Sequence, residues 1–510
     1  MNTIDIKSSQ FSGTVLQNSE SCFNVNVQTD VPAHLHLILT FDNECYLPQN
    51  FKYNLDAGSF SVTIPVPTST IGFWELEGEL LDSDTRLVVE YSAISIVKLP
   101  NMYKKKKASS FFGAMFITDY EAATDAGIEI ERVQAYWNAI ETSKGNYNWT
   151  DVDNKINECV ANGISAILTL RPEIFSYEIK TNWRGYSYPY DLIKEPIVSY
   201  YKEFIKKILL RYGDKIDYME VLNEPDLEFM DHWGFSVDLA APFVARLNQI
   251  SYDYIKEISP QTPVIALSVS GGDDYKFIKS VIEAIPEKQF DLIAPHPYPP
   301  SRQIVENQPF DWPEDYKLRE NLIDLQKYLE EHNLPTRLAC TEIGYTIPDF
   351  SRPLCYSSEI FASALARTFI VMKSIQNMEF VTWFDFDFYW DQFNEPDYSF
   401  VRADKIRYPY PAMNAFSTVT YILNDCQPVG DIKTSSAIQI WEFVDKISGR
   451  IVLAIWSDEE GFTLSFPQEE RVKYFDYFGR EIDCNYGMSI SCKPMYIEFK
   501  SRDFEYVAAD

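Results

Sequence analysis

The stretch IDYMEVLNEPD, residues 216–226, carries the clearest signal of the fold. A short apolar run, IDYMEVL, passes directly into the polar residues Asn223 and Glu224. Apolar runs of this length, bounded by turn residues, are typical of strands buried in a parallel sheet. In barrels of parallel strands the functional side chains lie at the carboxyl ends of the strands. We therefore expect residues 216–222 to form a strand and to deliver Asn223 and Glu224 to such a face.

Further runs of the same kind occur between residues 109 and 425, and they alternate with helical patterns such as the apolar positions 239, 243, 247, 250 and 254. The expected strands are FFGAMF (111–116), IEIERV (128–133), ISAILTL (164–170), IDYMEVL (216–222), PVIALSV (263–269), FDLIAP (290–295), RLACT (337–341) and FVTWF (380–384). Eight strands with intervening helices predict an α/β fold, the (β/α)8 TIM barrel. A doubly wound open sheet is the alternative, but the Gly-rich phosphate turn usual after its first strand is absent from the sequence.

Strand patterns without helices flank this central segment. The first 100 or so residues alternate apolar and polar positions, as in AHLHLILTF and RLVVEYSAISIV, and similar runs such as GRIVLAIW return after the barrel. This alternation is typical of sheets with one buried face. We predict a small N-terminal β-sandwich (residues 1–108), a catalytic barrel (109–425) and a small C-terminal β-sandwich (426–510). The basic run YKKKKA, residues 103–108, is interpreted as a solvated linker.

The composition excludes several classes of partner. The 510 residues include 46% hydrophobic and 24% charged residues, and the net charge is −30, which disfavours nucleic acid and anionic membranes as partners. No apolar run is long enough to cross a bilayer, and the N-terminus lacks a basic region followed by an apolar one. The eight cysteines are scattered, without a CxxC motif, which favours a reducing compartment. We therefore expect a cytoplasmic location.

The tetrapeptide Asn-Glu-Pro-Asp occurs twice, and its context separates the two copies. The first copy follows the expected fourth strand, whereas the second, residues 394–397, lies in a long loop where turn formation alone accounts for such residues. The seventh strand ends in RLACTEIGYT and places Glu342 at the same face as Glu224, 342 − 224 = 118 residues away. Strands four and seven lie on opposite sides of a barrel, so the two carboxyl groups face each other across its centre. A pair about 5–5.5 Å apart is the geometry of retaining glycoside hydrolysis.

The central segment resembles the retaining glycoside hydrolases of clan A, with similarity to families 39, 42 and 5. In these enzymes, the acid/base and nucleophile glutamates follow strands four and seven. The resemblance extends to ERVQAYWNAIETSKGNYNWTDVD, residues 131–153, which is similar to the strand-two region of the clan. The matching residues there are Arg132, Trp137, Glu141, Gly145, Tyr147 and Trp149. The segment APHPYP resembles the His-x-Tyr of strand six, and TWFDF resembles the end of strand eight.

The resemblance implies a role for each matching residue. Glu224 would be the acid/base, Glu342 the nucleophile, Arg132 the support of the nucleophile, Asn223 the partner of the sugar 2-hydroxyl, His296 and Tyr298 positioning residues, and Trp383 an aromatic floor under the sugar. Trp137 could contact the sugar or anchor the core under strand two. The segment RADKIRYPYPAMNAF, residues 402–416, follows the clan pattern only loosely, which leaves the identity of the sugar open.

The expected function is therefore hydrolysis of an O-glycosidic bond in an oligo- or polysaccharide through a covalent intermediate. No metal or cofactor is expected, since the remaining histidines form no ligand pattern. A non-catalytic carbohydrate-binding or scaffold protein on a degenerate barrel is the alternative from another class. A transglycosylase differs only in whether a sugar, rather than water, meets the covalent intermediate.

Overall fold

A computed structural model places most of the chain. The described residues are 2–42, 47–83, 86–97, 110–172, 193–231, 234–271, 275–348, 352–387, 397–402, 407–431, 438–445, 448–459, 462–464, 472–482 and 488–499.

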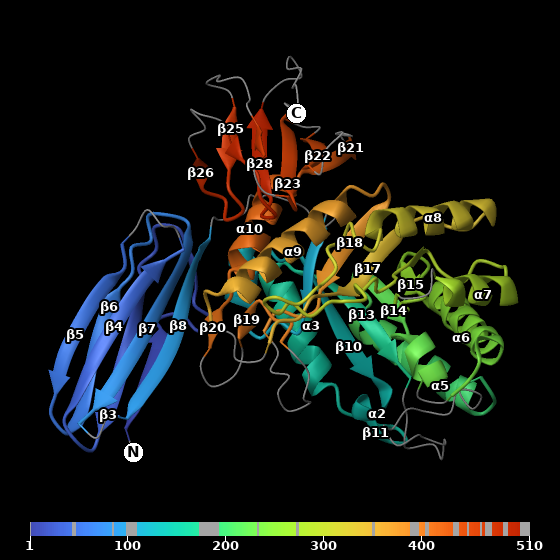
Figure 1. Cartoon of the computed structure of the whole chain (residues 1–510). Coiled ribbons are helices and arrows are strands. Elements are labelled where there is room, and N and C mark those ends of the chain that lie inside the picture. The colour runs from blue at the N-terminus through green and yellow to red at the C-terminus, as the bar shows by residue number, and fades with distance from the viewer. Residues whose placement is uncertain are drawn as a thin grey trace.

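A closed barrel of parallel strands occupies the middle of the chain, as Figure 1 shows. Its strands are β9 (Phe112–Met115), β10 (Ile130–Tyr136), β13 (Ser165–Arg171), β14 (Tyr218–Val221), β15 (Val264–Ala266), β16 (Leu292–Ile293), β17 (Leu338–Ile343) and β18 (Met378–Trp383). Each strand pairs with the next along the chain, and β18 pairs back with β9. The expected TIM barrel is confirmed.

Helices cover the outside of the barrel. They are α1 (Tyr120–Ala126), α2 (Trp137–Ile140), α3 (Thr150–Asn162), α5 (Ile197–Tyr212), α6 (Val237–Ile258), α7 (Lys276–Ala284), α8 (Leu318–Glu331), α9 (Tyr356–Lys373) and α10 (Ala412–Leu423). The stripe expected at residues 239–254 lies in α6, where Phe243 and Leu247 are buried but Leu239 is exposed. Among the described helices, none is long and apolar enough to cross a membrane.

The inside of the barrel is built in layers, because alternate residues of a strand point to the same face. An apolar layer lies toward the amino ends of the strands, with Ile130, Ile167, Ile265, Leu292, Ala294, Ala339 and Phe380 packed with Tyr218. Two residues further along five of these strands, the inward positions carry Arg132, Thr169, Glu220, Thr341 and Thr382, all buried. This polar layer separates the apolar layer from the carboxyl ends of the strands.

Two sheets form the N-terminal domain, drawn in blue beside the barrel in Figure 1. One has the order β1-β3-β6 and the other β2-β8-β7-β4-β5. The bounds are β1 (Thr3–Ser8), β2 (Thr14–Leu16), β3 (Cys22–Thr29), β4 (Ala33–Phe41), β5 (Gln49–Leu55), β6 (Gly58–Pro65), β7 (Gly72–Asp82) and β8 (Leu87–Val97). Side chains of both sheets, such as Val25 and Leu37, share one buried core. The predicted sandwich is therefore present, and Asn414 of α10 binds it through the carbonyls of Gly72 and Ile96, 3.1 and 2.9 Å away.

The C-terminal strands lie against α9 and α10 and appear in red in Figure 1. A larger sheet has the order β21-β22-β23-β28-β25-β26, and β24 pairs with β27. The bounds are β21 (Cys426–Asp431), β22 (Ile438–Asp445), β23 (Ile451–Ser457), β24 (Thr463–Leu464), β25 (Lys473–Phe475), β26 (Glu481–Ile482), β27 (Met488–Ser489) and β28 (Met495–Phe499). Arg367 of α9 connects this domain to the barrel, because its guanidinium donates hydrogen bonds to Asp458 at 2.6 Å and to Glu314 at 2.7 Å.

Candidate active site

A buried carboxylate, Glu220 of β14, organises the polar layer. Its Oε2 accepts from the Nε of Arg132 at 2.6 Å and from the hydroxyl of Thr169 at 2.5 Å. Its Oε1 accepts from the hydroxyls of Ser268 at 2.5 Å and Thr341 at 2.6 Å. Burial of a carboxylate is costly unless it is paired and hydrogen-bonded. These four hydrogen bonds therefore hold the Glu220 carboxylate in a fixed position beneath the carboxyl ends of the strands.

The backbone turns sharply where β14 ends. Leu222 and Glu224 have φ angles of 68° and 41°, in the left-handed region that residues with a Cβ rarely adopt. The amide of Leu222 donates to the carbonyl of Leu170 at 3.2 Å, and the amide of Glu224 donates to the carbonyl of Ser268 at 2.6 Å. Strained conformations persist where the neighbouring structure holds them, and they cluster at functional sites. Contacts to β13 and to the loop that follows β15 thus fix the direction of the Glu224 side chain.

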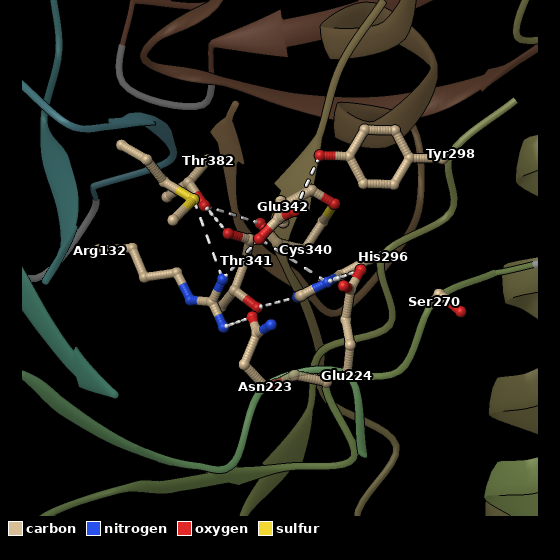
Figure 2. A network of polar contacts seen from close by, with 12 residues as sticks. Arg132, Asn223, Glu224, Ser270, His296, Tyr298, Cys340, Thr341, Glu342 and Thr382 are labelled. Atoms are coloured by element: carbon tan, nitrogen blue, oxygen red, sulfur yellow. Dashed lines mark hydrogen bonds and ion pairs between the residues drawn. The ribbon is translucent and has the colours of Figure 1, made fainter. Parts of the chain in front are cut away.

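Glu342, near the end of β17, accepts from two donors, one in β10 and one in the segment that follows β16 (Figure 2). The Nη1 of Arg132 lies 2.9 Å from its Oε2, and the hydroxyl of Tyr298 lies 2.9 Å from its Oε1. The same guanidinium donates through Nη2 to the Oδ1 of Asn223 at 2.8 Å. This contact orients the amide of Asn223 and leaves its N–H groups for another acceptor.

His296 connects the two glutamates. Its Nδ1 lies 3.0 Å from Glu224 Oε1 and 4.0 Å from Glu342 Oε2, and its Nε2 lies 2.9 Å from the hydroxyl of Thr341 (Figure 2). Oxygen and nitrogen atoms of Glu224, His296 and Glu342 all lie within 4.8 Å of one another. Such a trio resembles a cation site, but both imidazole nitrogens already face protein partners and the Arg132 charge lies 2.9 Å from Glu342. The three side chains are therefore better arranged to act as two interacting carboxyl groups than to bind a metal ion.

Burial dominates the electrostatics of this trio. It lowers the pKa of His296 to about 4, so the imidazole is neutral near pH 7. Burial raises the pKa of Glu224, and the nearby guanidinium of Arg132 opposes that rise. Burial and the charge of Glu224 raise the pKa of Glu342, while Arg132 and the Tyr298 hydroxyl oppose it. The pair therefore holds one proton more readily than two separate glutamates would.

Comparison with known proteins concerns the barrel as a whole. Residues 115–359 match the family model described as Cellulase (glycosyl hydrolase family 5). The barrel is a glycoside hydrolase barrel of clan A. A family 39 glycoside hydrolase from the gut symbiont Bacteroides cellulosilyticus WH2 has a TM-score of 0.68 and 18% identity, and the match covers 98% of this chain and 100% of that one.

Two further solved structures align less closely with this clan A hydrolase. A family 39 enzyme from Xanthomonas axonopodis pv. citri has a TM-score of 0.49 at 15% identity, covering 79% of this chain and 96% of that one. A monomeric beta-xylosidase from Caulobacter crescentus CB15 has a TM-score of 0.49 at 13% identity, covering 80% and 98%. A search of curated proteins finds no significant match.

The structure brings most of the sequence-predicted residues of this glycoside hydrolase together. Arg132 of the polar layer meets the residues at and beyond the carboxyl ends of the strands, which are Asn223, Glu224, His296, Tyr298 and Glu342. Residues 394–396 of the second Asn-Glu-Pro-Asp copy are outside the described residues. Its Asp397 accepts from the amide of Ser399 and the hydroxyl of Tyr410, both at 2.9 Å. Asp397 is therefore a half-buried residue that bonds its own loop segment and pairs with Ile347 in an isolated bridge.

The structure corrects the prediction that Trp383 and Trp137 contact the sugar. The Trp383 side chain has no exposed surface, and the rings of Phe369 and Tyr345 lie 6.1 and 6.3 Å from it in stacked orientations. The Trp137 side chain is also fully buried, stacks on Phe204 at 5.2 Å and donates to Glu141 at 2.7 Å. Both indoles pack in the core because other rings already cover their faces. For Trp137 this is the core-anchor interpretation that the sequence left open.

Sequence reasoning missed the polar layer around Glu220. A signal was present, because Glu220 interrupts the apolar run IDYMEVL at an inward position two residues before the strand end. Charged residues are almost never fully buried without a partner. An acidic residue inside an expected buried strand therefore predicts a buried cation, and Arg132 is that cation.

Proposed function

We propose that the chain is a retaining β-glycosidase that hydrolyses an oligo- or polysaccharide by double displacement. The observation that carries the proposal is the approach of Glu224 and Glu342 oxygens to within 4.8 Å. Retaining enzymes hold their carboxyl groups about 5–5.5 Å apart, whereas inverting enzymes need roughly 6.5–9.5 Å to fit a water molecule. The short separation supports direct attack by one carboxylate on the sugar.

The surroundings of each glutamate support the assignment of roles. Glu342 faces the Arg132 guanidinium and the Tyr298 hydroxyl, each 2.9 Å away, and both favour the ionised form that a nucleophile needs. Glu224 faces the neutral imidazole of His296 at 3.0 Å, and burial raises its pKa. The single proton of the pair therefore resides on Glu224. These contacts support the proposal that Glu342 is the nucleophile and Glu224 the acid/base.

The reaction then follows in two steps. A Glu342 oxygen attacks the anomeric carbon while the Glu224 proton passes to the glycosidic oxygen, so a glycosyl ester forms and the leaving alcohol departs. Glu224, now ionised, takes a proton from water, whose oxygen attacks the same carbon and releases Glu342. The amide N–H of Asn223, oriented by Arg132 at 2.8 Å, would donate to the 2-hydroxyl, a contact that strengthens in the transition state.

The test is hydrolysis of a panel of aryl β-glycosides by the wild type and by Glu342→Gln. We expect the wild type to cleave at least one of them and the variant to lose several orders of magnitude in kcat. Glu131→Gln is the matched control, because Glu131 is also buried in the barrel wall but bonds Tyr120 instead of the site. Equal rates in wild type and Glu342→Gln would refute the mechanism. A wild type that binds oligosaccharides but cleaves neither aryl glycosides nor polymers would favour the carbohydrate-binding alternative.

Product stereochemistry completes the test. A double displacement releases the β-anomer first, and NMR of the early reaction mixture distinguishes it from the α-anomer before mutarotation. Early release of the α-anomer would exclude the retaining route. Added acceptor sugars that appear in the products would favour transglycosylation over hydrolysis.

A further inference from the structure

A continuous chain of hydrogen bonds runs from Glu220 through Thr341 and His296 to Glu224, and Figure 2 shows its last three members. The donor and the acceptor of each hydrogen bond in this chain can be derived by starting from Glu220. Although burial opposes it, the charge of Arg132 and the hydroxyl donors hold the pKa of Glu220 below its ordinary value. An ionised carboxylate only accepts hydrogen bonds. Glu220 therefore fixes the hydroxyl protons of all its partners.

Thr341 in turn determines which ring nitrogen of His296 carries the hydrogen. Its single hydroxyl proton points to Glu220 Oε1, 2.6 Å away. The Thr341 oxygen can then only accept from the Nε2 of His296 at 2.9 Å, so Nε2 carries a hydrogen. Nδ1 of the neutral imidazole is consequently a lone pair, and it faces Glu224 Oε1 at 3.0 Å. A protonated Glu224 donates to that lone pair, whereas an ionised Glu224 is repelled by it.

We propose that Glu220 is a positioning residue which, through Thr341, sets the tautomer of His296 and thereby keeps Glu224 protonated before the first step. The inference rests on the proposed function, because it assumes that Glu224 is the acid. In the first step the proton leaves its contact with Nδ1 for the glycosidic oxygen. The carboxylate that remains faces the lone pair, which favours recovery of a proton from water in the second step.

The other charged groups near Glu224 do not supply this tautomer control. The groups that act on Glu224 or His296 from the surrounding elements are Arg132 in β10, Arg171 in β13, Glu220 in β14, Asp226 after β14, Arg302 after β16 and Glu342 in β17. The three arginines favour an ionised Glu224, so they oppose the effect of the His296 lone pair. The proton on Glu224 thus depends on burial, on the negative charge of Glu220, which also raises the pKa of Glu224, and on the His296 tautomer.

The first experiment compares the pH dependence of kcat/KM in Thr341→Val and Thr169→Val. Both variants remove one hydroxyl donor from Glu220, but only Thr341 also contacts His296. Without Thr341 as acceptor, the hydrogen moves to Nδ1 and donates to ionised Glu224. In Thr341→Val, we expect the alkaline limb of the pH profile of kcat/KM to move to lower pH by about one to two units. Thr169→Val should keep the wild-type position of that limb.

An unmoved limb in an active Thr341→Val would overturn the tautomer inference and leave the proposed function standing. Equal shifts in both variants would also overturn it, because they would mean a general effect of losing a donor to Glu220. A wild type without glycosidase activity would instead refute the proposed function.

The second experiment observes the tautomer of the wild type directly and does not depend on enzyme activity. Nitrogen-15 NMR of histidine-labelled wild type distinguishes protonated from unprotonated ring nitrogens, and His296→Asn identifies the signals among the five histidines. We expect a protonated Nε2 and an unprotonated Nδ1 at neutral pH. A protonated Nδ1 in the wild type at that pH, alone or together with Nε2, would overturn the proposal.

Discussion

Arg132 and Glu220 form an ion pair with no exposed side-chain surface, with the Nε of Arg132 2.6 Å from Glu220 Oε2. The same guanidinium reaches Glu342 at 2.9 Å, so one buried cation lies between two carboxylates from opposite sides of the barrel. Buried pairs contribute little net stability, but removing one partner leaves an uncompensated charge. Stability and activity should therefore depend on Arg132 in separable ways.

We expect Arg132→Met to lose about 3–5 kcal/mol of unfolding free energy, because Glu220 would remain buried without its cation. The double variant Arg132→Met/Glu220→Gln should recover part of that loss but little activity, since Glu342 still lacks Arg132. Urea unfolding and kcat/KM of both variants test this. Equal stability of the single and double variants would mean that the Glu220 charge is compensated by other groups.

Tyr298→Phe removes a hydrogen bond to Glu342 without changing the shape of the residue. The lost hydroxyl favours the ionised form of Glu342, so its removal raises the pKa of the nucleophile. The acidic limb of kcat/KM should move to higher pH, and kcat should fall by about 10- to 100-fold.

Tyr120→Phe is the matched control for this variant, since Tyr120 donates to Glu131 at 2.7 Å outside the site. It should change stability but leave the acidic limb in place. An acidic limb that moves to lower pH in Tyr298→Phe would contradict the assignment of that limb to Glu342.

The sequence predicts those parts of the site that depend on strand ends. Residues 216–222 and 337–341 were expected as strands, and the observed β14 and β17 bring Glu224 and Glu342 to one face of the barrel. This succeeds because strand order and direction are regular in a barrel, so a position along the chain translates into a position in space.

The sequence does not predict the burial of the two tryptophans. Whether Trp383 offers a face to a sugar depends on rings as distant in the chain as Tyr345, Phe369 and Phe400, which lie 6.3, 6.1 and 6.2 Å away. Such packing depends on tertiary arrangement rather than local pattern. The sequence does not reveal the chain of hydrogen bonds from Glu220 for the same reason, because Thr341 and His296 come from segments far in the chain from Glu220 and Glu224.

Asn414→Ala should weaken the contact between α10 and the N-terminal domain. The buried amide donates to the carbonyls of Gly72 and Ile96, which would lose a donor each. We expect a loss of about 1–3 kcal/mol in thermal or urea unfolding. Thr420→Val is the control on the same helix, since its buried hydroxyl bonds only the helical carbonyl of Phe416 among the described contacts. An equal loss in both variants would contradict a specific role of Asn414.

Azide should separate the roles of Glu224 and Glu342 by product stereochemistry. Glu224→Ala leaves the nucleophile in place, so an aryl β-glycoside with an activated leaving group should still form the covalent intermediate and then stall for lack of a base. Azide, a small anion, can enter the space of the missing carboxylate and attack from that side, which restores turnover and yields the β-glycosyl azide. In Glu342→Ala, azide would instead replace the nucleophile and yield the α-glycosyl azide. NMR of the two products makes the assignment, and the opposite pair of anomers would exchange the roles of the two glutamates.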